Sequence, residues 1–247
     1  MKVFKFGGAS VKDPSGIRNL SKIVSAEKGD LVIVVSAFGK TTNALEKVLN
    51  TWIKRDNSWK DHLERIYNYH NSIVDELFDM NDPVWNIIEN SFAILKEYLL
   101  REMKSVYDYE YDQIVSYGEI WSTLIISEYL NRKGLNVKRI DIRDKLVTDD
   151  RYRDANILWG ESYLRIRPAF DLSEYPYYLT QGFIGAPFQG RLQHLVARVL
   201  IILLLFWQLY LMLKVSLSGK MYPDCSMLIL NGCLMVRNLS RYHTEKL

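Results

Sequence analysis

Short apolar runs alternate with amphipathic stretches along the first fifty residues. Residues 3–6 and 31–35 form largely apolar runs, and the second is unbroken and rich in β-branched side chains. Such a run suits a strand that is buried on both faces of a parallel sheet. Residues 17–24 and 45–49 instead carry apolar side chains at helical spacing. The order strand, loop, helix, strand, loop, helix predicts an α/β fold, whose ligands bind at the carboxyl ends of the strands.

The following segment, residues 51–115, has a different pattern. Residues 59–78 and 83–100 carry mixed charge, with an apolar residue every three or four positions, which predicts two or more amphipathic helices. The aromatic side chains of this segment are expected in the core, and the lone His70 is expected to have a structural role. Further along, the pattern predicts a helix over residues 120–131 and strands over residues 135–140 and 177–186.

The stretch from Lys5 to Ser10 follows the first predicted strand and reads Lys-Phe-Gly-Gly-Ala-Ser. Two adjacent glycines, Gly7 and Gly8, let a phosphate approach the bare backbone, where amide protons and the following helix can hold an anion. The Lys5 ammonium could neutralise charge on a transferring phosphoryl group. A strand that ends in a tight glycine turn, with Lys5 solvated, explains the hexapeptide equally well.

Two other features have both a structural and a functional interpretation. Ser116 and Glu119 have the spacing of a capping box at the start of a helix, but Glu119 could also bind an amino group there. An aspartate-rich segment could hold magnesium, although solvated turn residues are commoner. The aspartates of this segment are Asp141, Asp144, Asp149 and Asp150.

Composition narrows the class of protein. The chain has 247 residues, of which 48% are hydrophobic, enough for a sizeable core. A net charge of +3 without a long basic run argues against nucleic acid as a partner. Cys225 and Cys233 lack the spacing of a zinc site or a disulfide framework. The N-terminus lacks the pattern of a signal peptide, so the expected location is the cytoplasm.

Four motifs in order carry a specific resemblance: KFGGAS, VVSA followed by TTN, SYGE before a helix, and TQGFIGA. Over residues 1–186 the chain resembles aspartate kinase of the amino-acid kinase family. The resemblance implies an α/β fold, the three-layer α/β/α sandwich of the amino-acid kinase (carbamate kinase-like) type, here incomplete. It also implies transfer of a phosphoryl group from ATP, with Mg²⁺, to L-aspartate. This gives 4-phospho-L-aspartate, on the way to lysine, threonine and methionine.

The resemblance also assigns roles to individual residues, and none of them is a metal ligand. Lys5 would stabilise the transferring phosphoryl group as the catalytic residue. The nucleotide phosphates would contact Lys5, Gly7, Gly8, Ser10 and Gly182, and L-aspartate would contact Ser36, Thr42 and Glu119. ATP and L-aspartate are therefore the expected partners, and the intact family member is expected to form a homo-oligomer. Kinases of the same family that act on glutamate or carbamate are an alternative.

After Ala186 the family pattern stops. The family should continue with a threonine run, a GREGSDYTAA-like loop and a WKDVPG-like segment, but residues 199–207 are apolar throughout. A buried helix or a membrane anchor over residues 195–213 would explain this run. The run is short for a membrane span and Gln208 interrupts its extension, so a membrane is not the expected partner.

A frameshift explains more of this segment. Codons permitted for residues 192–208, read one nucleotide earlier, spell Thr-Thr-Thr-Phe-Gly-Arg-Glu-Gly-Ser-Asp-Tyr-Thr-Ala-Ala-Ile-Leu-Ala. Codons permitted for residues 214–225, read in the same shifted frame, can encode a segment that contains Trp-Lys-Asp-Val-Pro-Gly. Trp207 and Met221 are each encoded by a single codon, and both codons are compatible with the family motifs in the shifted frame. We therefore hypothesise a one-base frameshift between about Ala186 and Leu192.

The expected domain organisation follows from this hypothesis. Residues 1–186 would be a partial amino-acid kinase catalytic domain. Residues 187–247 would be an aberrant, out-of-frame tail that is poorly ordered or forms a non-native helix. Because the tail lacks two loops that the family uses for catalysis, little or no kinase activity is expected. A membrane-tethered nucleotide- or amino-acid-binding protein, anchored by residues 195–213, is the alternative from another class.

Overall fold

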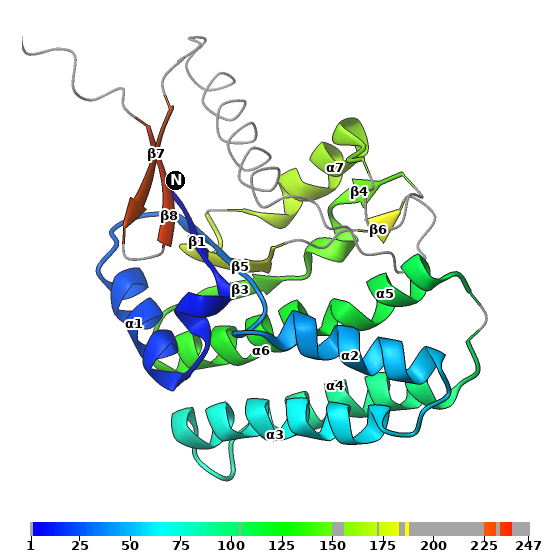
Figure 1. Ribbon diagram of the computed structural model, residues 1–247. Coiled ribbons are helices and arrows are strands. Elements are labelled where there is room, and N and C mark those ends of the chain that lie inside the picture. The colour runs from blue at the N-terminus through cyan, green and yellow to red at the C-terminus, as the bar shows by residue number, and fades with distance from the viewer. Residues whose placement is uncertain are drawn as a thin grey trace, which may run out of the picture.

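The computed structural model describes residues 2–103, 105–149, 156–171, 173–182, 186–187, 225–230 and 233–238. A central six-stranded sheet has the strand order β3-β5-β2-β1-β8-β7 (Figure 1). Its four N-terminal strands run parallel: β1 (Lys2–Phe6), β2 (Leu31–Val35), β3 (Val137–Ile140) and β5 (Tyr177–Gln181). Every residue of β2 is buried, as its unbroken apolar run predicts.

Helices cover the sheet and extend away from it. Figure 1 shows α6 next to the sheet and α3 and α4 on the side of α2 and α6 that faces away from it. The predicted α/β architecture is thereby confirmed. The helices are α1 (Pro14–Ser25), α2 (Thr41–Ile53), α3 (Trp59–Leu77), α4 (Pro83–Leu100), α5 (Tyr107–Val115), α6 (Tyr117–Arg132) and α7 (Trp159–Ile166), with 3-10 turns η1 (Gly8–Val11), η2 (Ile142–Asp144) and η3 (Arg167–Ala169).

The strand predicted over residues 177–186 is shorter in the structure. β5 ends at Gln181, and β6 (Ala186–Pro187) belongs to a separate two-stranded sheet with β4 (Val147–Thr148). The glycine at 182 separates the two strands in the sequence, and glycine in a strand pattern often marks such a break.

The tail contributes two strands that the sequence analysis did not predict. β7 (Cys225–Leu230) and β8 (Cys233–Asn238) pair antiparallel, and β8 also pairs antiparallel with β1. These two segments are strands in the structure, and the assignment of residues 187–247 as an aberrant tail stays a prediction. The physical reason for the strands is visible in the sequence, where two six-residue segments with four or five apolar residues each flank Asn231-Gly232, a typical hairpin dipeptide.

The predicted anchor over residues 195–213 lies outside the described residues. Within the described part of the chain, no helix has both the length and the apolar character that crossing a bilayer requires.

His70 has the structural role that the sequence predicts. Its side chain is fully buried, and its Nδ1 atom lies 2.8 Å from the carbonyl oxygen of Ile66. The ring stacks on Phe38 and meets Phe92 and Trp121 edge to face. Burial lowers the pKa of His70 to about 4, so the ring is neutral in the folded protein.

Candidate functional site

Three loops meet at the carboxyl ends of β1, β2 and β5, and backbone hydrogen bonds join them. The Ser36 amide donates to the Phe6 carbonyl at 3.1 Å, and the Gly182 amide donates to the Val35 carbonyl at 3.0 Å. The Gly39 amide donates to the Gly8 carbonyl at 3.0 Å. The parallel order of β5, β2 and β1 brings these loops to one edge of the sheet, where α/β proteins bind ligands.

The glycine pair after β1 is required by close packing. A Cβ atom on Gly8 would lie only 2.5 Å from the carbonyl oxygen of Ala37, a distance that backbone atoms cannot accommodate without moving. The Ser10 amide donates to the Gly7 carbonyl at 2.8 Å and closes the turn into η1. A Cβ atom on Gly7 would lie 3.4 Å from Nζ of Lys5, so the ammonium lies directly over bare backbone.

Glu119 reaches the same edge of the sheet from α6. Its side chain is 6% exposed, and its Oε1 atom accepts a hydrogen bond from the Ala37 amide at 3.4 Å. The neighbouring Gly118 permits this approach, because a Cβ atom there would lie 2.9 Å from Cβ of Ala37. Burial raises the pKa of Glu119 to about 7, against a smaller opposing effect of the Ala37 amide.

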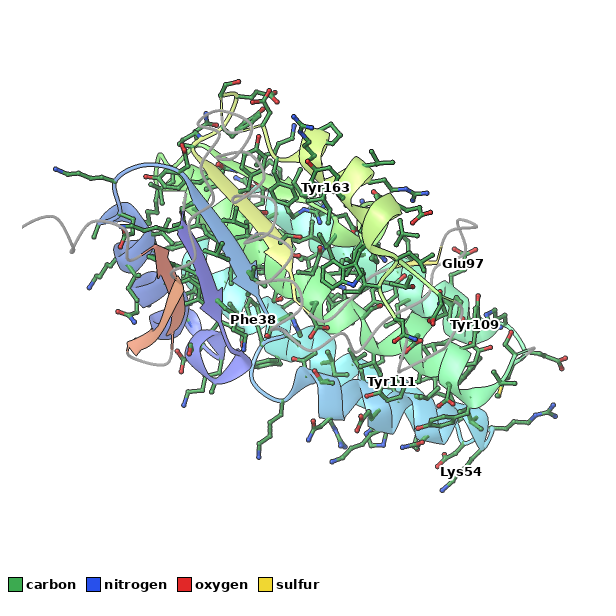
Figure 2. The ribbon with its side chains drawn as sticks, turned by 90° about the horizontal axis from the view of Figure 1, so that it is seen from above. Phe38, Lys54, Glu97, Tyr109, Tyr111 and Tyr163 are labelled. Atoms are coloured by element: carbon green, nitrogen blue, oxygen red, sulfur yellow. The ribbon has the colours of Figure 1, made fainter. Side chains whose placement is uncertain are left out.

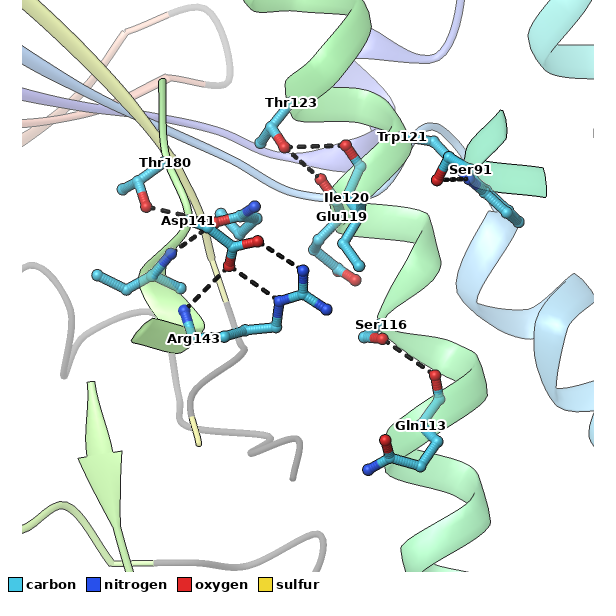
Figure 3. Close-up of polar contacts among 12 residues, drawn as sticks. Ser91, Gln113, Ser116, Glu119, Ile120, Trp121, Thr123, Asp141, Arg143 and Thr180 are labelled. Carbon is cyan, nitrogen blue, oxygen red and sulfur yellow. Dashed lines mark hydrogen bonds and ion pairs between the residues drawn. The ribbon is translucent and has the colours of Figure 1, made fainter. Parts of the chain in front are cut away.

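The capping box predicted for Ser116 and Glu119 is wrong. Ser116 has helical dihedral angles, and its hydroxyl donates to the Gln113 carbonyl at 3.3 Å rather than capping α6 (Figure 3). The reason is that α5 ends at Val115, directly before Ser116, so the chain enters α6 from another helix rather than from a loop. The interpretation of Glu119 as a contact for an amino group stays a prediction.

The remaining predicted residues lie on the same loops. The Ser36 hydroxyl is buried and has no hydrogen-bond partner among the described residues. A Cβ atom on Gly182 would lie 3.9 Å from that hydroxyl oxygen, so Ser36 and Gly182 are neighbours. Thr42 is half-buried in the first turn of α2, directly after the loop that carries Ser36. A buried hydroxyl without a partner is a candidate for a ligand contact.

The described members of the aspartate-rich segment do not gather into a metal site. Asp141 accepts two hydrogen bonds from the Arg143 guanidinium, at 2.9 and 2.5 Å (Figure 3). Burial would raise the pKa of Asp141, but the bonds from Arg143 outweigh it and lower the pKa. Asp149 accepts from Asn156, and Asp150 lies outside the described residues. Within the described ranges, no three histidine, cysteine, aspartate or glutamate residues are grouped as metal ligands.

One polar contact at this edge of the sheet was not predicted from the sequence. Gln181, the last residue of β5, is fully buried, and its Oε1 atom accepts a hydrogen bond from the Ile142 amide at 2.9 Å. Its Nε2 atom has no partner within the described part of the chain. Gln181 directly precedes Gly182 in the TQGFIGA motif, and this position next to a predicted site residue could have indicated its contact.

Comparisons with known proteins agree with this geometry. Residues 1–184 match the amino acid kinase family. The chain is 30% identical over 199 residues to an aspartokinase of Chlamydia trachomatis, covering 76% of this chain and 41% of that protein. It is 28% identical over 195 residues to the chloroplastic bifunctional aspartokinase/homoserine dehydrogenase 2 of Arabidopsis thaliana, covering 74% of this chain and 21% of that protein.

A solved structure extends the similarity to the fold. E. coli aspartokinase III, in complex with aspartate and ADP, superposes with a TM-score of 0.64 at 27% identity. The match covers 77% of this chain and 42% of that one, so the chain spans less than half the length of the relatives it matches. With the family matched over residues 1–184 and the motif loops assembled at one edge of the sheet, the chain belongs to the amino acid kinase family.

Proposed function

We propose that residues 1–186 form the part of an aspartokinase that holds the terminal phosphates of ATP beside L-aspartate. The observation that carries the proposal is the junction at Ala37. Its carbonyl oxygen packs against Gly8 of the glycine turn, and its amide donates to the Glu119 carboxylate. One residue thus connects the predicted phosphate loop to the predicted amino-acid contact. The E. coli relative, whose complex contains aspartate and ADP, supports the same pair of ligands.

The proposed chemistry is a phosphoryl transfer. A side-chain carboxylate oxygen of L-aspartate attacks the γ-phosphorus of ATP, the bond to the bridging oxygen breaks, and ADP leaves. Positioning and charge neutralisation supply most of the catalysis in such reactions. In this chain Lys5 would neutralise charge on the γ-phosphate, while the backbone around Gly7, Gly8 and Ser10 would hold the phosphates and Gly182 would line the other side.

Glu119 would hold the amino group of L-aspartate. An ammonium close to this buried carboxylate favours its charged form and compensates for the desolvation that now raises its pKa. Ser36 and Thr42 would supply hydroxyl groups to the same amino acid. We expect L-aspartate affinity to fall as pH drops below about 7, the pKa at which Glu119 gains a proton.

Magnesium enters this proposal only with the nucleotide. Mg²⁺ in kinases is commonly bound by substrate phosphates, water and one or two carboxylates. Because the described residues offer no cluster of metal-ligating side chains, we derive no step from a metal held by the protein itself. Homo-oligomerisation of the intact protein stays a prediction.

We further propose that this chain has little or no kinase activity. The serine-aspartate loop and the WKDVPG-like segment of the family are absent from the sequence after Ala186. A one-base frameshift between about Ala186 and Leu192 accounts for both absences. Sequencing of the encoding DNA tests the frameshift, because codons that do not spell the family motifs in the neighbouring frame would reject it.

A coupled assay of ADP release tests the function. The chain as written is expected to show no more than a trace of L-aspartate-dependent turnover, and the frame-restored chain is expected to show full turnover. L-Glutamate in place of L-aspartate is the matched control for the substrate. Aspartate-dependent rates typical of an intact enzyme in the unrestored chain would reject the inactivity, and a preference for L-glutamate would reject the substrate.

A further inference from the structure

A concave site lies beside the phosphate loop but contains none of the residues predicted for that loop. It has a volume of about 520 Å³, and it is bounded by the segment after η1, by α2 and by α3. Ligand pockets for small molecules commonly have volumes of about 300–1,000 Å³. The pocket is lined by Lys12, Asp13, Lys40, Thr41, Ala44, Lys47, His62, Arg65, Ile66 and Tyr69.

The pocket is strongly positive. Three lysines and Arg65 face the single carboxylate of Asp13, so three positive charges remain uncompensated when His62 is neutral. The Asp13 carboxylate already accepts a hydrogen bond from the Gly16 amide at 2.8 Å, as the N-cap of α1. Cations of one sign in a concave site focus the potential and attract counter-ions.

These cations are also available to a ligand. Among the ion pairs found in the described ranges, none involves Lys12, Lys40, Lys47 or Arg65. The acidic residues of α2 and α3 do not line the pocket. Glu46 of α2, for example, accepts a hydrogen bond from the Tyr111 hydroxyl instead.

The part of the pocket formed by Tyr69 and Lys12 is held in position by close contacts. Tyr69 of α3 donates a hydrogen bond to the carbonyl of Lys12. A Cβ atom on Gly39 would lie 3.1 Å from the Tyr69 hydroxyl and 3.4 Å from Cβ of Lys12, so these three segments converge closely. The apolar lining consists of Ala44, the buried Ile66 and the Tyr69 ring. Packing thus fixes this part of the wall, and the lining combines cationic side chains with an apolar surface.

We propose that this pocket binds a polyphosphate group, separately from the nucleotide site of the proposed kinase reaction. A single phosphate would leave part of the positive charge uncompensated, whereas two or three linked phosphates match it. Inorganic polyphosphate and the phosphate chain of a nucleotide share this chemistry. The apolar lining distinguishes them, because only the nucleotide has an organic part to place against it.

Calorimetric titration of sodium tripolyphosphate into the full chain tests the proposal. The exposed residues Lys47 and Arg65 are replaced together in K47A/R65A, and the matched control is K54A/K96A, which removes two exposed lysines outside the pocket. Lys54 lies at the far end of α2 from Phe38 (Figure 2). We expect K47A/R65A to weaken tripolyphosphate binding about tenfold or more, and the control to change it less than about twofold.

Two further titrations distinguish the pocket from the nucleotide site, and a nucleotide from inorganic polyphosphate as the ligand. In K5A, which disables the proposed phosphate loop, tripolyphosphate binding to the pocket is expected to persist. In the same K5A background, ATP that binds more tightly than tripolyphosphate identifies a nucleotide, and weaker ATP binding identifies an inorganic ion. Equal losses in K47A/R65A and K54A/K96A, loss of all binding in K5A, or no saturable binding at all would overturn the proposal. If K47A/R65A unfolds, the single variant K47Q replaces it with the same expected direction.

Discussion

The carboxylate of Glu119 lies against the backbone amide of Ala37, with 3.4 Å between Oε1 and the amide nitrogen. The two residues are separated by 82 positions in the chain, and the contact joins the start of α6 to the loop after β2. The same Ala37 also sets the packing limit on Gly8. A buried acid with a raised pKa at the edge of a parallel sheet is typical of a functional site.

The raised pKa of Glu119 makes stability depend on pH. Its pKa is about 7 in the folded chain and about 4.3 in an unfolded one, so the folded state binds the extra proton between these values. The contribution is full below about pH 4.3 and is lost as pH rises through about 7, a total of about 4 kcal/mol. The variant E119Q has no such loss, so we expect it to be more stable than the parent chain at pH 8, measured by urea unfolding. Equal stability of the two chains at pH 8 would contradict this.

His70 makes stability depend on pH in the opposite direction to Glu119. Its pKa is lowered to about 4 by burial, against about 6.5 in an unfolded chain, so between these values the unfolded state binds the extra proton. Stability from His70 is therefore present above about pH 6.5 and is lost as pH falls towards 4, by about 3 kcal/mol. Because the two effects oppose each other between about pH 4.5 and 6.5, they largely cancel in the parent chain.

The variant H70L exposes the Glu119 contribution alone. We expect its stability to fall as pH rises from about 4.5 to 6.5, while the stability of E119Q rises over the same interval. Urea unfolding at several pH values measures both slopes. Slopes of the same sign in H70L and E119Q would show that at least one of these groups does not titrate as its burial requires.

Replacement of Gly8 tests the packing between the two loops. The variant G8A places a methyl group 2.5 Å from the Ala37 carbonyl oxygen, so we expect a loss of about 1–3 kcal/mol in the free energy of unfolding. The matched control is G160A, because a Cβ atom on Gly160 of α7 meets no atom within 4 Å. Alanine is preferred to glycine in helices by up to about 1 kcal/mol, so G160A should be neutral or slightly stabilising. Equal destabilisation by both variants would contradict the packing argument.

The sequence predicted which loops share an edge of the sheet, but not the contacts that join them. A glycine pair after one strand and a small-residue loop after the next must share an edge in a parallel sheet. The pattern alone therefore predicts that Gly8 and Ser36 lie at the same edge. The near-continuity of α5 and α6 could not be predicted, because Ser116 and Glu119 have the local spacing of a helix start.

For the tail, the sequence contained a structural signal that the family resemblance obscured. Residues 187–247 depart from the family pattern, but the segments on either side of Asn231-Gly232 still carry a local strand and hairpin signal. β8 pairs with β1 through backbone hydrogen bonds, which place few demands on the side-chain sequence. An apolar, β-prone segment can therefore extend a sheet regardless of its origin.

We propose that Lys5 and Glu119 belong to one site, in which Lys5 contacts the nucleotide and Glu119 contacts the amino acid. Calorimetric affinity for a non-hydrolysable ATP analogue, with and without L-aspartate, tests it most directly in the parent chain, K5A and E119Q. We expect K5A to weaken analogue binding about tenfold or more, and E119Q to abolish the effect of L-aspartate while leaving binding of the analogue alone intact. Analogue affinity that is unchanged in K5A, or an L-aspartate effect that survives in E119Q, would contradict the account.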